Sequence, residues 1–320
     1  MSKHWSQLKE QSAGSFRLNF MLRIYQIFGR FILQIFVFPV VFSVFIFSKP
    51  VRVFSRKYLN RIYEFKIKQG EKSLKKPNGF SAFWHIFSFA DSLMDKMISW
   101  SGKIDFDQIN IKDQSEFDSL MGELKNDNPP FLICSHLGNM EVLRAIGNFY
   151  TSDLLGRKLE VHSVVQAGHT PKFTNFLRKI NPKAADNLTA TANMGIDAVI
   201  DLKEKLQSGK MIVIAGDRTA AKNENRSIAV DFLGTPAYFP IGSFTLASLM
   251  ESPIYFIFCL KGKGGKYDLY LQRTKVDFDC TRSVRKERVK DLMQEYSAML
   301  EKLCLKYPNQ WYNFFDFWKS

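Results

Sequence analysis

The stretch that decides the fold runs from Phe131 to Glu141 and reads FLICSHLGNME. Its first five residues form an apolar run that predicts a buried strand, and Asn139 is a suitable cap for a following helix. Further strands are predicted at 159–166, 211–217 and 253–260, with helical patterns at 194–209 and 241–250 between them. This alternation predicts an α/β fold in which helices flank a mixed central sheet.

The carboxy-terminal third adds three features to this pattern. The turn KGKGGK (261–266) leads into YDLYLQR (267–273), which predicts a hairpin, and a long charged helix is expected from Thr281 to Lys306. Residues 232–242 read FLGTPAYFPIG, and we expect an apolar loop that forms one wall of a hydrophobic substrate groove. Gly234 and Pro240 lie in that loop and are candidate substrate-binding residues.

Composition narrows the classes of function. The 320 residues include 45 Lys and Arg against 31 Asp and Glu, a net charge of +14, and 30 Phe. Such apolar content excludes a disordered chain, and the basic surface favours nucleic acid or an anionic membrane as partner. The four cysteines form no CxxC pair, which argues against a zinc site and for a reducing compartment. No metal or bound cofactor is indicated.

The amino-terminal region is predicted to contact a membrane. The run FILQIFVFPVVFSVFIF (31–47) contains no charge and has basic residues on both sides. It is short for a spanning helix, so it either crosses the bilayer or lies in its interface, while a buried core helix is the alternative. A second aromatic, amphipathic helix is expected at 80–100. We therefore predict a membrane-associated helical region (1–103) followed by an α/β domain (104–320).

His136 and Glu141 form the first candidate for chemistry. His136 follows a strand, where open α/β sheets place their sites, and Glu141 lies in the first turn of the next helix. A carboxylate on one ring nitrogen would leave the other as a base, and the helix start would offer N–H groups to an oxyanion. The alternative is a capped helix beside a structural histidine. Asn139 lies between the two and is a candidate substrate contact.

A second polar strand end follows MIVIA (211–215). Arg218 is suited to bind a phosphate or a thioester-linked anion, and Asp217 to orient that anion or a hydroxyl. The alternative for these two residues is a surface ion pair.

These motifs together resemble a known family. HLGNME (136–141) matches the H-x4-[DE] signature of the glycerolipid and lipid A acyltransferase superfamily. The wider layout is similar to the late acyltransferases of lipid A, in particular to a lysophospholipid-type branch associated with aryl polyene lipid clusters. The segments that carry this similarity are GDRT (216–219), FLGTPAYFPIG (232–242) and PNQWYNFF (308–315).

The resemblance implies roles for the site residues. It implies that His136 is the general base, that Glu141 orients it, and that Asp217 and Arg218 belong to a further active-site block. The lipid A enzymes carry a Tyr-Arg-Pro-type block where this chain reads VVQAGHTP (164–171). Gln166 or His169 would serve there instead, which leaves the acceptor open.

The function expected from the sequence is O-acyl transfer from acyl carrier protein or acyl-CoA to a hydroxyl of a lipid or glycolipid. The expected location is the cytoplasmic side of a bacterial inner membrane. Two alternatives stay open: a non-catalytic membrane protein that binds lipid or a polyanion, and a hydrolase that uses water as acceptor. A nucleic-acid partner is not expected.

Overall fold

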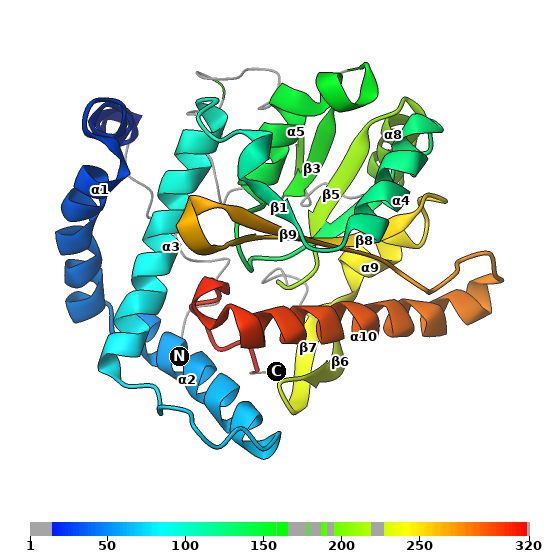
Figure 1. The fold of residues 1–320 in the computed structure, drawn as a ribbon. Coiled ribbons are helices and arrows are strands. Elements are labelled where there is room, and N and C mark those ends of the chain that lie inside the picture. The colour runs from blue at the N-terminus through cyan, green and yellow to red at the C-terminus, as the bar shows by residue number, and fades with distance from the viewer. Residues whose placement is uncertain are drawn as a thin grey trace.

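The computed structural model describes residues 15–157, 159–165, 178, 187–190, 195–218 and 227–318. Figure 1 shows a central sheet with helices on both faces and a group of helices at one side formed by the start of the chain. The main sheet contains β1 (Ile109–Ile111), β2 (Phe131–Cys134), β3 (Val161–Val165), β4 (Leu188–Ala190), β5 (Met211–Ala215), β8 (Ile254–Lys261) and β9 (Tyr267–Arg273). The helices are α1 (Ser15–Phe47), α2 (Lys49–Lys68), α3 (Gly79–Trp100), α4 (Gln114–Lys125), α5 (Met140–Leu155), α8 (Ile196–Gln207), α9 (Ile241–Ala247) and α10 (Arg282–Lys306).

The main sheet is mixed, as the sequence predicts. Its strand order is β1-β9-β8-β2-β5-β3-β4, and β8 pairs antiparallel with β9 through the expected hairpin while the other neighbours are parallel. The central strand β2 is buried along its whole length. Alternate residues of β2 therefore serve two hydrophobic cores: Phe131 and Ile133 face α8, α9 and α10, and Leu132 faces α4 and α5.

Residues 232–242 do not form the loop that their sequence suggested. They belong to a separate two-stranded sheet of β6 (Ser227–Phe232) and β7 (Thr235–Pro240), which runs directly into α9. The turn requires Gly234, whose φ is 73°. Phe232 and Phe239 alternate onto one face of the hairpin and are fully buried. Because these rings are buried, the segment is part of the core. An apolar sequence pattern does not distinguish residues that face the core from residues that line a groove.

The described part of the amino-terminal region, residues 15–100, contains three helices that pack against the α/β core. The segment Arg23–Phe47 contains an 18-residue window with a mean hydropathy of 2.2 and is long and apolar enough to cross a membrane by length and composition, which suggests membrane association. Gly29 interrupts α1 with non-helical backbone angles, and α2 ends at Lys68. Asn78 caps α3 through a reciprocal bond with Ser81. Buried residues of α1 and α3 belong to the same core as β2 and β8, and the boundary at 103/104 stays a prediction.

Candidate active site

The register of the sheet brings His136 and Asp217 together. The parallel strands β2 and β5 pair Cys134 with Ala215, and each polar residue follows its strand end by two positions. The imidazole Nδ1 lies 2.7 Å from Asp217 Oδ1, and the backbone N–H of His136 donates to Oδ2 at 2.9 Å. Residues that follow the ends of two adjacent parallel strands by the same number of positions lie side by side at the edge of the sheet. The sequence already contains these two equal spacings.

Asp217 is completely buried among hydrogen-bond donors. The indole Nε1–H of Trp311 donates to Oδ2 at 2.9 Å, and the amide of Asn313 lies 3.4 Å from the same oxygen. Burial alone would raise the pKa of Asp217, but the charge and hydrogen bonds of His136 and the charge of Arg218 outweigh burial and lower this pKa well below its usual range. The carboxylate is therefore ionised and can only accept protons in hydrogen bonds.

These contacts leave His136 suited to act as a base. About a third of its side chain is exposed, at 35%. Burial and the nearby charge of Arg218 lower its pKa below the usual 6.5, against the opposing effect of Asp217. With Nδ1 donating to Asp217, the neutral imidazole carries its proton on that nitrogen and presents Nε2 as an acceptor.

Glu141 does not make the contact that its spacing suggested. Its carboxylate accepts from Trp100 Nε1 at 2.9 Å and from Arg144 Nη1 at 2.9 and 3.0 Å, and it lies 3.9 Å from Lys96 Nζ. Burial alone would raise its pKa, but Arg144 and Lys96 lower it below the usual value. In the described residues, the oxygen atoms that hold the imidazole belong to Asp217. Any role of Glu141 in catalysis stays a prediction.

The loop between β2 and α5 is fixed from two sides. Gly138 has a φ of 80°, and a Cβ on it would lie 2.1 Å from the carbonyl oxygen of Cys259. Asn139 donates from its backbone to that same carbonyl at 2.8 Å and from its side chain to Ser92 O on α3, also at 2.8 Å. The Asn139 side chain therefore ties the loop to α3.

The carboxy-terminal segment braces the same loop. Gly138 N donates to Gln310 O at 2.9 Å, and Tyr312 N donates to His136 O at 3.1 Å. Arg218 donates from Nε to Asn313 Oδ1 at 2.7 Å and from Nη2 to Tyr312 O at 2.6 Å. Residues 310–313 thus hold both strand-end loops in one arrangement. Reasoning from sequence assigned no site residue here, although this segment contributed to the family resemblance.

Comparison with known proteins shows that part of the chain is similar to one family. Residues 183–320 match the family model described as bacterial lipid A biosynthesis acyltransferase. The match supports membership of the lipid A and lysophospholipid acyltransferase superfamily. No curated protein matches the chain closely enough to extend the comparison. The matched range contains Asp217, Arg218 and Trp311, whereas His136 and Glu141 precede it.

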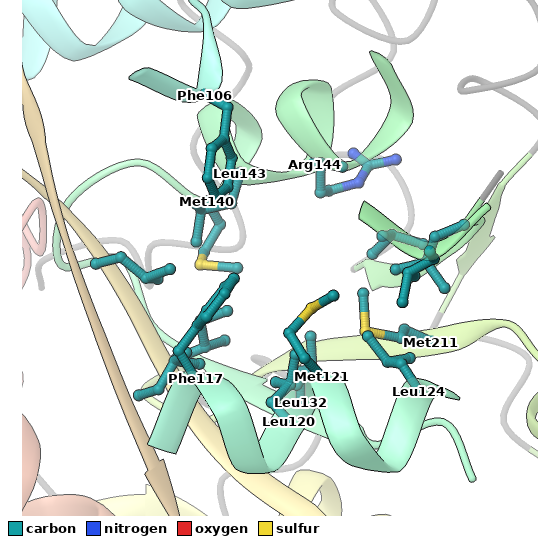
Figure 2. Close-up of a pocket in the computed structure, with 17 residues that line it drawn as sticks. Phe106, Phe117, Leu120, Met121, Leu124, Leu132, Met140, Leu143, Arg144 and Met211 are labelled. Atoms are coloured by element: carbon teal, nitrogen blue, oxygen red, sulfur yellow. The ribbon is translucent and has the colours of Figure 1, made fainter. Parts of the chain in front are cut away.

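An apolar cavity borders one face of the sheet beside α5. The cavity is partly open to solvent and lies between α4, α5 and one face of the sheet (Figure 2). Met140 and Leu143, on the first turns of α5, line one side of it. Arg144, which binds Glu141, is among its few polar neighbours. The cavity is therefore built on the helix that begins four residues after His136.

The remaining predicted site residues lie elsewhere. Gly234 is at the β6–β7 turn, where an added Cβ would meet the ring of Phe65 at 3.0 Å, and Pro240 ends β7. The hairpin reaches the site indirectly, because the ring of Phe232 packs on Trp311 at 5.2 Å between centroids. Gln166 and His169 lie outside the described residues, so their assigned roles stay predictions.

Proposed function

We propose that this protein is a membrane-associated O-acyltransferase that moves a fatty or polyene acyl chain from a thioester to a hydroxyl of a lipid. The observation that carries the proposal is the pairing of a partly exposed His136 with a buried Asp217 at adjacent strand ends, 2.7 Å apart. The family match to lipid A biosynthesis acyltransferases supports the same class of reaction.

The pair supports a general-base mechanism. His136 Nε2 would take the proton of the acceptor hydroxyl as its oxygen attacks the thioester carbonyl. The tetrahedral intermediate would collapse with loss of the carrier thiolate, which receives the proton from the imidazolium. Ionised Asp217 favours that imidazolium electrostatically and fixes which nitrogen acts. The positive charge of Arg218 and the amino-terminal end of α5 would stabilise the oxyanion.

The substrates are proposed from the chemistry of the surroundings. The acyl chain of the donor would enter the apolar cavity beside α5. Acyl carrier protein is acidic, so the net charge of +14 favours it over a neutral carrier, with acyl-CoA as the other thioester donor. Both donors are cytoplasmic, which supports a location on the cytoplasmic face of a bacterial inner membrane. Without a Tyr-Arg-Pro-type block, a lysophospholipid is as suitable an acceptor as a glycolipid.

The test is transfer by purified full-length protein from acyl carrier protein or acyl-CoA to a mixed lipid extract, read by mass spectrometry. We expect His136→Ala to lose about 10²- to 10⁴-fold in rate, the contribution of a general base. A melting curve like that of the parent protein controls for folding. Full thioester-dependent acylation by the variant would overturn the mechanism. Release of free fatty acid with no acylated lipid would identify a hydrolase instead.

The exposed apolar helix α1 and the basic surface also suit a non-catalytic lipid-binding protein. That function predicts binding of the same lipids by the parent protein and by His136→Ala, without turnover of a thioester by either. Any turnover that depends on His136 would exclude it.

A further inference from the structure

We propose that α1 lies in the plane of the membrane as an interfacial anchor for an anionic bilayer, and does not cross it. The proposal goes beyond the enzymatic function, because it concerns how the chain meets its membrane.

Helix α1 packs along α3. Arg30 Nη2 lies 2.7 Å from Asp91 Oδ1, and Gln34 Nε2 donates to the same oxygen at 2.8 Å. Further along α1, Phe38 and Phe45 both contact the ring of Phe83, at 5.2 and 5.6 Å between centroids. As α1 advances from residue 30 to 45, its partners on α3 move back from Asp91 to Phe83. The two helices are therefore antiparallel neighbours over about 22 Å.

Helix α3 is in turn fixed to the α/β core. Its Ser92 carbonyl accepts from Asn139, three residues after His136, and its His85 Nε2 lies 2.9 Å from the carbonyl of Trp311. Asp95 of α3 is also ion-paired with Lys261 of β8 at 3.0 Å. Figure 1 shows α3 between α1 and the rest of the domain.

The packing of α1 on α3 and the packing of α3 on the α/β core together exclude an arrangement in which α1 crosses the membrane. If α1 stood across a bilayer, α3 and the site behind it would enter the hydrocarbon with it. Asp91, Asp95 and Lys261 are charged groups whose transfer into hydrocarbon is costly. With α1 lying flat, the same charges stay on the protein side, and the site lies about one helix diameter, roughly 10 Å, from the membrane.

The outer face of α1 is apolar. Large apolar side chains on it are exposed to an extent unusual for a soluble monomer. Near the middle and end of α1 these include Phe31 at 72% and Phe47 at 83% exposure, and the start of α3 adds Phe80 at 73% and Trp84 at 51%. Aromatic rings at this density are typical of a surface that sits at the boundary between headgroups and acyl chains.

The charge of the segment that follows α1 identifies the surface on which α1 rests as an anionic lipid surface. Residues 49–76, which follow α1 directly, contain ten basic and two acidic residues. The exposed members of this basic segment include Lys72, Lys75 and Lys76, in the connection between α2 and α3. Lipid phosphates lie at the edge of the apolar layer in which α1 would rest, so the basic segment would meet them.

The orientation of α1 is tested with the full-length protein added to preformed vesicles that contain phosphatidylglycerol. Spin labels on single cysteines at Phe31, Ile35, Phe42 and Ile46, in a Cys280→Ser background, report depth. We expect one shallow depth, about 5–10 Å below the headgroups, at all four positions. A depth profile that peaks near Ile35 and Phe42, with the other two at opposite surfaces, would overturn the proposal. In inside-out cell membranes, an amino-terminal tag should be cleavable from the side of the catalytic domain; a protected tag would equally overturn it.

The lipid charge is tested by vesicle sedimentation with and without phosphatidylglycerol. Changing Lys72, Lys75 and Lys76 to Gln should weaken binding to anionic vesicles about fivefold per charge and leave binding to neutral vesicles unchanged. The matched control changes Lys275, Lys286 and Lys290 to Gln. These three lysines are exposed and lie before α10 or in its amino-terminal part. Equal losses in both triple variants would refute a localised basic segment. Binding does not require turnover, so His136→Ala should behave as the parent does, and failure of the enzymatic proposal would leave these results intact.

Discussion

Replacing Asp217 by Asn gives the sharpest test of how the imidazole is held. Four donors point at this carboxylate: the ring Nδ1 and backbone N of His136, the indole of Trp311 and the amide of Asn313. Three of the four meet Oδ2, and the ring meets Oδ1. An Asn offers one acceptor oxygen and one NH₂ group, so it must choose between these two positions.

The count of donors decides the choice. With its oxygen in the place of Oδ2, the Asn keeps three hydrogen bonds and turns its NH₂ toward Nδ1. The imidazole must then accept at Nδ1, which moves its proton to Nε2 and removes the base that faces the substrate. A wrong tautomer of this kind lowers kcat about 10⁴-fold in a serine protease. We expect a loss of about 10³- to 10⁴-fold in kcat here, with KM little changed, because the acyl cavity is untouched.

The assay is steady-state acyl transfer with three variants: Asp217→Asn, Glu141→Gln as the isosteric control, and Asp217→Asn combined with His136→Ala. Glu141 accepts from Trp100 and Arg144, so its Gln variant should lose less than about tenfold. The double variant should be no worse than His136→Ala alone, because the two residues act as one unit. A reversed order, with Glu141→Gln the more damaging change, would refute the pairing read from the structure.

Three further predictions follow from the same structure. The rate should rise with pH and level off through a pKa below 6.5, because burial and Arg218 lower the pKa of His136; an acidic limb above 7 in a pH–rate profile would contradict this. Gly147→Leu should fill the cavity and shift donor preference to shorter acyl chains by at least about fourfold per displaced methylene. The control Gly122→Leu changes a residue on α4 outside the cavity and should leave donor preference unchanged. Competition between donors of different chain length measures this preference. Burial lowers the pKa of His85 to about 4, so this side chain binds a proton more weakly in the folded protein than in the unfolded chain. The free energy of unfolding should therefore fall by about 2 kcal/mol between pH 7.5 and 5. Denaturant unfolding of His85→Asn should show a smaller fall.

Local patterns predicted much of the architecture. The apolar runs that form β2, β5 and β8 lie where their sequences indicate, and the hairpin and α10 follow the predicted turn and helix closely. These elements were accessible because strand burial and helix periodicity depend on neighbours a few residues apart. The hairpin at 227–240 was not predicted, because its apolar residues do not indicate whether they face the core or a substrate groove.

The sequence by itself determined the chemical groups at each strand end: His136 after β2, and Asp217 with Arg218 after β5. It also determined the apolar, cation-flanked character of α1. Only the tertiary structure decided which carboxylate holds the imidazole, because five-residue spacing favoured Glu141 while β2–β5 register placed Asp217 2.7 Å away. Only the tertiary structure likewise set α1 alongside α3, since pairing between residues more than fifty positions apart depends on the whole fold and leaves no local periodicity.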